Sequence, residues 1–135
     1  MITILAAVND IFFYTKLRDA LKPHGYHLER ARSQHDVPEK IATIHPAACV
    51  IDMNDAALDG LKALEGIRAD ARFQNLPVLA FANHEEVGTW QQARRLGVSK
   101  IVSRNEFSSR TRDLLAEVLS GTGIDGIQPE APTTS

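Results

Sequence analysis

The chain has 135 residues and a net charge of −2, with 44% hydrophobic and 24% charged residues. This length suits one domain with a substantial core and is too short for two ordinary domains. The weak negative charge argues against direct nucleic-acid binding, and no apolar run approaches the roughly 20 residues that cross a membrane. One cysteine excludes an internal disulfide and is typical of a reducing compartment. These features predict a cytoplasmic protein that contacts neither nucleic acid nor membrane directly.

Five short apolar segments predict the strands of a β-sheet. In chain order they are residues 2–8, 26–31, 47–52, 77–81 and 100–103. The first, third and fourth segments are almost continuously apolar. Continuous apolarity is typical of parallel strands that are covered by helices on both faces of the sheet.

The segments that follow these strands have the apolar periodicity of helices. The first of these helices begins after Asp10. Asp36 with Glu39 resembles a capping box that opens the second helix, and Asn83 with Glu86 is expected to cap the fourth. The apolar positions of the five helices are Phe13, Leu17 and Leu21; Ile41 and Ile44; Leu61, Leu64 and Ile67; Val87, Trp90, Ala93 and Leu96; and Leu114, Leu115 and Val118.

Strands and helices of these lengths, in alternation, predict an α/β domain over residues 1–120. We expect a doubly wound parallel sheet of five strands with five helices and right-handed crossovers. Residues 121–135 are rich in Gly, Pro and Thr and contain only two isolated isoleucines. Such a segment buries too little apolar area to offset its ordering entropy, so we predict a disordered C-terminal tail.

The functional crevice of such a sheet lies outside the carboxyl ends of its strands. Asp10 follows the first strand, Asp52 ends the third, and Arg104 follows the fifth. These three side chains are therefore expected to converge. Two neighbouring carboxylates repel each other unless a cation joins them, and oxygen ligands of this kind suit Mg²⁺.

The residues around Asp52 resemble a known family. Residues 52–60, Asp-Met-Asn-Asp-Ala-Ala-Leu-Asp-Gly, are similar to the segment that follows the phosphoryl-accepting aspartate in the receiver domains of response regulators. The Asp59-Gly60 pair, residues 76–79 (Leu-Pro-Val-Leu) and the Gly97-Val98 pair lie in the same register as their counterparts in that family. The resemblance covers roughly residues 2–119 and implies the flavodoxin-like, CheY-like form of the doubly wound fold.

The resemblance also implies a site and partners. Asp52 would accept the phosphoryl group, while Asp10, Asp52 and the Asn54 backbone carbonyl would hold Mg²⁺. Arg104 stands where the family has a lysine and would neutralise the phosphoryl oxygens. The phosphoryl donor would be a sensor histidine kinase or a phosphotransfer protein. A protein partner would bind the surface formed by the fourth helix, the fifth strand and the fifth helix.

Several positions depart from the family pattern. Asn9 replaces one of two adjacent acidic residues, which should weaken the affinity for Mg²⁺. Ala82 replaces the hydroxyl residue that bonds the phosphoryl group, and Ile101 replaces the aromatic residue that moves on activation. Asn105 stands where a proline usually follows the lysine.

Two functional interpretations follow from this pattern. In the first, the chain is a stand-alone atypical receiver domain of two-component signal transduction that is phosphorylated on Asp52. In the second, it is a pseudo-receiver that is never phosphorylated and serves as an adaptor through its fourth-helix surface. Both act through protein–protein contacts. We expect no enzymatic activity of its own, because the sequence has neither a Gly-rich phosphate loop after the first strand nor a nucleophile–base pair.

The roles expected of four side chains are as follows. Asp10 is either a metal ligand or the N-cap of the first helix. Trp90 either packs in the core or belongs to the partner surface. Cys49 is expected to be an inert core residue, and Asp55 a loop carboxylate that is not a ligand.

Overall fold

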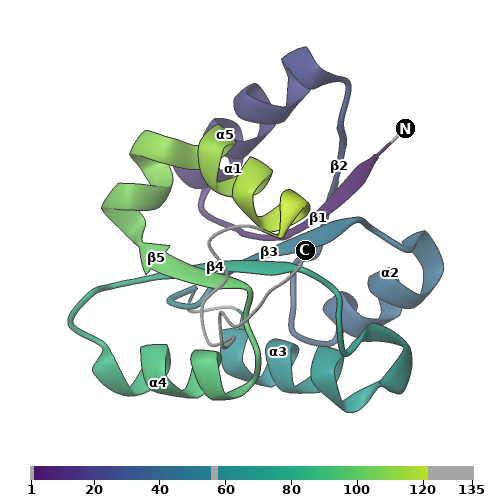
Figure 1. The fold of residues 1–135 in the computed structure, drawn as a ribbon, viewed down its shortest axis with the longest axis vertical. Helices are drawn as coiled ribbons and strands as arrows, with labels where there is room; N and C mark the ends of the chain where they lie inside the picture. Colours follow the sequence, from purple (N-terminus) through teal and green to yellow (C-terminus); the bar gives the residue numbers. More distant parts are fainter. Residues whose placement is uncertain (1, 56–57, 122–135) are drawn as a thin grey trace, which may run out of the picture.

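The computed structural model describes residues 2–55 and 58–121, so all of the tail predicted at 121–135 except its first residue lies outside this part. Within these residues, five parallel strands form one sheet in the order β2-β1-β3-β4-β5 (Figure 1). The strands are β1 (Thr3–Ala7), β2 (His27–Arg30), β3 (Ala48–Asp52), β4 (Val78–Ala82) and β5 (Lys100–Ser103). The predicted doubly wound α/β fold is confirmed.

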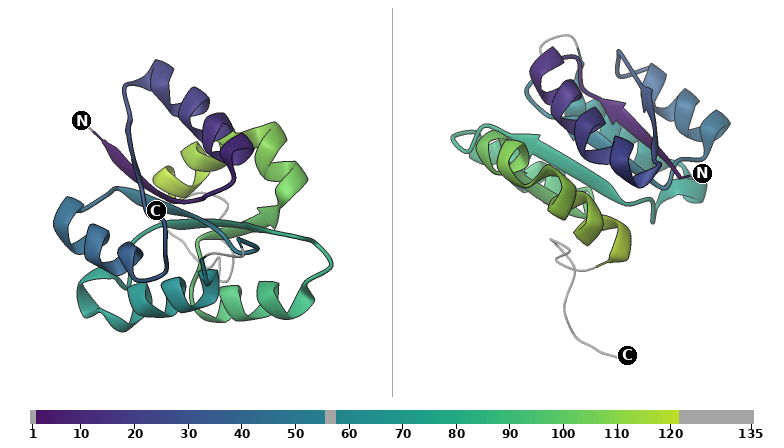
Figure 2. Two further views of the ribbon diagram at one scale, coloured as in Figure 1. Left: turned by 180° about the vertical axis from the view of Figure 1, so that it is seen from behind. Right: turned by 90° about the horizontal axis from the view of Figure 1, so that it is seen from above.

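Five α-helices accompany the sheet in the same described residues. They are α1 (Ile11–Leu21), α2 (Asp36–Ile44), α3 (Gly60–Ala69), α4 (Val87–Arg95) and α5 (Arg104–Ser120), with short 3₁₀ turns at Lys22–His24 and Ala71–Phe73. Helices α1 and α5 cover one face of the sheet, and α2, α3 and α4 cover the other (Figures 1 and 2). None of the helices described is long and apolar enough to span a bilayer.

The sheet separates two apolar clusters because successive strand residues point to opposite faces. On the α1–α5 face, the rings of Phe81 and Phe107 stack with centroids 4.2 Å apart, and Phe13 lies 5.1 Å from Phe81. On the other face, Ile51 of β3 packs in a cluster with Leu64 and other residues of α3. All five residues of β3 are buried, so this central strand places Asp52 at the edge of a rigid core.

The predicted cap of α2 is wrong. The N-cap residue is His35, which makes no side-chain capping bond, and Asp36 is already inside the helix. The Ser33 hydroxyl accepts the backbone N–H of Asp36 at 3.3 Å, and the Asp36 carboxylate accepts the backbone N–H of Arg32 at 3.2 Å. A turn formed by the preceding loop therefore replaces the capping box, and the Asp36 side chain holds that loop.

The predicted cap of α4 is wrong as well. Glu86 occupies the N-cap position without a side-chain capping bond, and Asn83 lies in the loop before the helix. Val87, which the periodicity places on the inner face, is 59% exposed. Trp90 is half-buried against the core, and its indole N–H donates to the Asn83 carbonyl at 3.0 Å. Trp90 therefore both packs against the core and holds the loop before α4 through this hydrogen bond.

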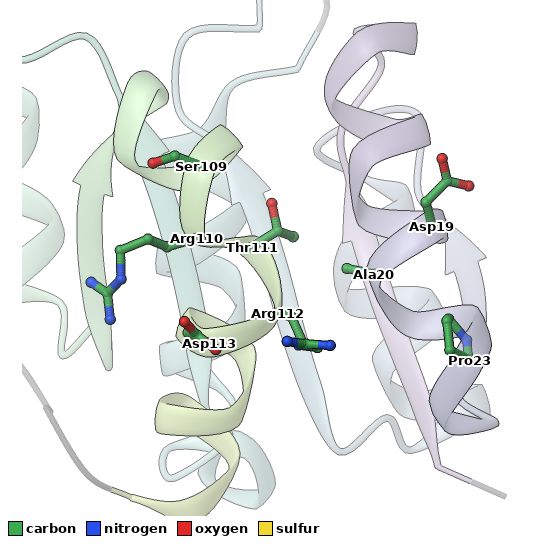
Figure 3. A pocket seen from close by; sticks show the side chains of 8 residues that line it. All are labelled: Asp19, Ala20, Pro23, Ser109, Arg110, Thr111, Arg112 and Asp113. Carbon is green, nitrogen blue, oxygen red and sulfur yellow. The ribbon is translucent and has the colours of Figure 1, made fainter.

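Helix α5 is interrupted at Arg110, whose backbone is not helical (φ −130°, ψ 29°). The Arg110 guanidinium bonds to Glu106 at 2.8 Å and to Glu117 at 2.6 Å, which joins the two halves of the helix. An open hollow lies between α1 and α5 at this point (Figure 3). Its lining residues are Asp19, Ala20, Pro23, Ser109, Arg110, Thr111, Arg112 and Asp113. This hollow shares no residue with the predicted functional site.

The start of α3 passes very close to the end of β3 at Gly60. A Cβ atom at this position would lie 3.0 Å from both the Cα and the Sδ of Met53, and 3.2 Å from the Ile51 side chain. The Met53 Cα belongs to the backbone directly after Asp52, so it cannot move without disturbing the site. Glycine is therefore required by the close approach of the two elements.

We predict that Gly60→Ala lowers the free energy of unfolding by about 1–3 kcal/mol, because the added methyl group overpacks this contact. Gly88→Ala is the matched control, since a Cβ at Gly88 of α4 meets nothing within 4 Å. It should raise stability by up to about 1 kcal/mol through helix propensity. Urea unfolding of both variants measures the difference, and equal effects would contradict the close-contact explanation.

Candidate functional site

The site is built around Asp52 at the carboxyl end of β3. Asp52 is 1% exposed, although it is a carboxylate at the edge of the sheet. Asp10 follows β1, the strand beside β3, and Arg104 follows β5, which is separated from β3 by β4. The structure thus brings the three predicted side chains together, with Arg104 reaching across β4.

Arg104 connects the two carboxylates. Its Nη1 lies 3.0 Å from Asp52 Oδ1, and its Nη2 lies 3.5 Å from Asp10 Oδ2. The guanidinium carbon lies 4.4 Å from the centroid of the Phe13 ring and 5.6 Å from that of Phe81. Aromatic faces attract a cation at these distances, so the two rings hold the planar guanidinium over β4.

The pKa of Asp52 is raised above its ordinary value of 3.8. The largest cause is burial, which disfavours the charged form. The backbone N–H of Asn54, which donates to Oδ1 at 3.0 Å, and the Arg104 guanidinium both oppose this shift. The nearby Asp55 carboxylate adds to it by repulsion. Asp52 therefore depends on its two donors to remain ionised.

Asp10 is the N-cap of α1, which was one of the two roles predicted for it. Its Oδ1 accepts the backbone N–H of Phe12 at 2.9 Å and that of Phe13 at 3.4 Å. The other carboxylate oxygen faces Arg104. Both oxygens of this side chain therefore have partners within the protein.

Asn54 and Asp55 link the loop after β3 to the loops beside it. The Asn54 side-chain oxygen accepts the backbone N–H of Asn83, which ties this loop to the one after β4. Asp55 Oδ2 accepts the backbone N–H of Asn9 at 3.0 Å, which ties it to the loop after β1. Sequence reasoning left both contacts out. Asn and Asp residues after a strand do indicate side-chain bonds to backbone N–H groups. The sequence does not indicate which loop supplies those N–H groups.

The Asn9 side chain bonds to the loop that follows β2. Its side-chain nitrogen donates to the Arg32 backbone carbonyl at 3.0 Å, and the backbone carbonyl of Asn9 accepts from Arg30 Nη2 at 3.0 Å. Asn9 therefore fastens the edge strand β2 to the loop after β1.

Three of the four carboxylate oxygens of Asp10 and Asp52 already have partners within the protein. Both oxygens of Asp10 and Oδ1 of Asp52 are engaged by backbone N–H groups or by Arg104. In the part of the chain that is described, no three His, Cys, Asp or Glu side chains are grouped to hold a metal ion. Mg²⁺ requires near-octahedral oxygen ligands. A metal ion bound to Oδ1 of Asp52 would therefore have to displace the Arg104 guanidinium from that oxygen.

The remaining site positions are apolar and buried. Ala82 is 0% exposed at the end of β4, and Ile101 is 3% exposed on the α2–α3–α4 face. Neither can form a hydrogen bond through its side chain. Cys49 lies within β3, where burial raises the pKa of its thiol to about 12. The expectation of an inert core cysteine agrees with this environment.

Comparison with solved structures identifies the class of fold. The chain, with its five parallel strands and five helices, has the fold of CheY-like receiver domains. No family model matches the sequence, and no curated protein matches it.

Three solved structures illustrate the likeness. A chemotaxis protein CheY4 from Vibrio cholerae has a TM-score of 0.76 at 17% identity, over 87% of this chain and 98% of the other. A sensor protein from Polaromonas sp. JS666 has a TM-score of 0.74 at 20% identity, over 88% and 96%. A two-component response regulator from Legionella pneumophila has a TM-score of 0.75 at 16% identity, over 89% and 99%.

We predict that Arg104→Met raises the pKa of Asp52 further. Methionine keeps an apolar stem over Phe13 but removes the charge that favours the ionised carboxylate. The buried carboxylate then lacks its partner, so the free energy of unfolding at neutral pH should fall by about 1–3 kcal/mol. Carbon-13 NMR titration of the carboxyl group measures the pKa. Arg112→Met on α5 is the control, and an unchanged pKa in Arg104→Met would contradict the assigned pairing.

The raised pKa of Asp52 also predicts a pH dependence of stability. Its folded-state pKa lies above the unfolded value, so the folded protein binds this proton more tightly. The resulting stabilisation is fully present below the pKa that Asp52 has in the unfolded chain. It is lost as the pH rises through the pKa that Asp52 has in the folded protein. Asp52→Asn cannot lose a proton and does not show this decline.

We therefore expect Asp52→Asn to gain stability relative to the parent chain as pH rises from about 4 to about 7. Urea unfolding across this range measures the difference between the two proteins. Asp19→Asn, which changes an exposed carboxylate on α1, serves as the control. A difference that stays constant with pH would contradict the raised pKa.

Proposed function

We propose that the chain is a pseudo-receiver, a receiver-fold signalling module that works through protein contacts without phosphorylation of Asp52. The observation that carries this proposal is the position of the Arg104 guanidinium between Asp10 and Asp52. A permanent cation of the chain itself takes the role that a bound metal ion has in joining two carboxylates. The site is then complete in its resting state.

The burial of Asp52 supports the proposal. A phosphoryl donor must bring its phosphorus within reach of a carboxylate oxygen, yet the Asp52 side chain is 2% exposed and one oxygen is shared by two donors. Charge-assisted hydrogen bonds of this kind contribute about 1.5–3 kcal/mol each. A nucleophilic attack would require Arg104 to move away first, which would leave a buried carboxylate without its cation.

The positions that depart from the family pattern support the same proposal. Ala82 offers no hydroxyl to a phosphoryl oxygen, and Asn9 is occupied with the Arg32 carbonyl. Each of these residues stabilises the observed structure through packing or a local bond. Together these residues favour a site whose side chains stabilise the fold and do not bind a phosphoryl group.

The output in this proposal is a protein contact. The solved structures with the same fold include a chemotaxis protein, a sensor protein and a two-component response regulator, which favours a role in two-component signalling. The partner would be a sensor histidine kinase, a phosphotransfer protein or a downstream protein of such a system. The α4–β5–α5 surface is the proposed contact, with the exposed Val87 and the Arg94 guanidinium stacked 5.4 Å from the Trp90 centroid.

An atypical receiver that is phosphorylated on Asp52 is the second candidate. It is favoured by the convergence of Asp10, Asp52 and Arg104 at the carboxyl edge of the sheet. In this alternative, Arg104 would exchange the Asp52 carboxylate for phosphoryl oxygens.

Incubation with Mg²⁺ and acetyl phosphate separates the two candidates. We predict that intact mass spectrometry finds no phosphoryl adduct on the chain under conditions that modify a phosphorylatable receiver domain. Beryllofluoride, an analogue of the phosphoryl group, should likewise leave the NMR signals of Asp10, Asp52 and Arg104 unchanged. An adduct that disappears in Asp52→Asn would overturn the pseudo-receiver proposal and establish the second candidate.

A double variant tests whether Asn9 and Arg104 are the residues that weaken Mg²⁺ binding. Asn9→Asp with Arg104→Lys adds a carboxylate and replaces the planar guanidinium by a compact ammonium group. This double variant should gain affinity for Mg²⁺, because ligand charge largely sets the affinity of hard cations. Titration of Mg²⁺ followed by NMR compares it with the parent chain.

A further inference from the structure

Asn54 is bonded on two sides at the edge of the site. Its backbone N–H donates to Asp52 Oδ1 at 3.0 Å, and its side-chain oxygen accepts the backbone N–H of Asn83. The first bond fixes Asn54 against the end of β3. The second joins it to the exposed loop that leads from β4 into α4. One residue therefore connects the buried carboxylate with a surface loop.

The same loop is held from its other side by Trp90. The Asn83 carbonyl accepts two hydrogen bonds, one from the Glu86 backbone N–H at 3.1 Å and one from the Trp90 indole N–H at 3.0 Å. The peptide groups of Asn83 are thus clamped between Asn54 and Trp90. Arg94 lies over the Trp90 ring, so the indole also orders a cation on α4.

Asp52 Oδ1 is common to the pair with Arg104 and to the bond with Asn54. Both donors lie 3.0 Å from this single oxygen. A change in the Asp52–Arg104 pair therefore changes the acceptor that positions Asn54. The perturbation can pass through hydrogen bonds to Asn83 and on to Trp90, with no participation of Ala82 or Ile101.

We propose that Asn54 is a positioning residue that couples the Asp52–Arg104 pair to the outer face of α4 through Asn83 and Trp90. Its use in signalling rests on the proposed function, since α4 belongs to the proposed partner surface. The coupling itself is a property of the chain alone. It replaces the hydroxyl and aromatic movements that the resemblance to receiver domains would otherwise assign to positions 82 and 101.

Trp90 is the single tryptophan of the chain, so its indole N–H gives one unambiguous signal in a nitrogen-15 NMR spectrum. Asn54→Ala removes the acceptor for the Asn83 N–H and releases one side of the clamp. The indole signal should shift, and its hydrogen exchange should become about five- to tenfold faster, the factor that loss of one ordinary hydrogen bond gives. Asp52→Ala should change the indole signal in the same direction.

Two matched variants test the route. Asn83→Ala keeps the backbone groups that take part in the clamp, so the indole signal should stay as in the parent chain. Asn54→Asp retains an oxygen acceptor for the Asn83 N–H and should restore the slow exchange. The amide spectrum of each variant verifies that it is folded.

The coupling is overturned if the indole signal of folded Asn54→Ala matches that of the parent chain, or if Asn83→Ala alters it as strongly. The experiment uses neither a phosphodonor nor a partner. Its failure would therefore leave the pseudo-receiver proposal intact, whereas phosphorylation of Asp52 would overturn that proposal and leave the coupling standing.

Discussion

The Asp52 carboxylate and the Arg104 guanidinium form the contact on which the rest of the site depends. Asp52 is placed at the edge of the core by β3, a strand whose residues are all buried. A carboxylate in such a position needs a cation and hydrogen-bond donors to stay ionised. Arg104 supplies the cation from the far side of β4, and two aromatic rings fix its orientation. The same guanidinium also pairs with Asp10, and the same Asp52 oxygen accepts the backbone N–H of Asn54.

This contact also shows that the fold of the chain does not by itself determine the chemistry of the site. A CheY-like sheet brings its carboxyl-edge residues together whatever their identity, because strand order and crossovers fix their positions. The chemistry depends on the individual side chains at that edge. Here an arginine bridges two carboxylates, an alanine fills a buried position and an asparagine bonds to a neighbouring loop. The site can organise surface loops even if it transfers no phosphoryl group.

The sequence predicted β3 and β4 well because every residue of these two strands is buried. Residues 47–52 and 77–81 read as continuous apolar runs, and the observed strands begin and end within one residue of them. The caps at Asp36 and Asn83 were predicted wrongly because the backbone N–H of each residue has a partner outside its helix. The Ser33 hydroxyl accepts the N–H of Asp36, and the Asn54 side chain accepts the N–H of Asn83. The Asn54–Asn83 bond joins residues 29 positions apart and leaves no local pattern in the sequence.

The most direct test of the account follows Arg104 while Mg²⁺ is added. Nitrogen-15 NMR of the Arg104 guanidinium reports whether it stays on Asp52, and carbon-13 NMR of the Asp10 and Asp52 carboxyl groups reports metal binding in the same sample. If the guanidinium is a permanent partner of Asp52, the Arg104 signals keep their positions and slow exchange throughout the titration. Release of the guanidinium, together with shifts of both carboxyl signals, would contradict it and would restore a metal-dependent receiver site.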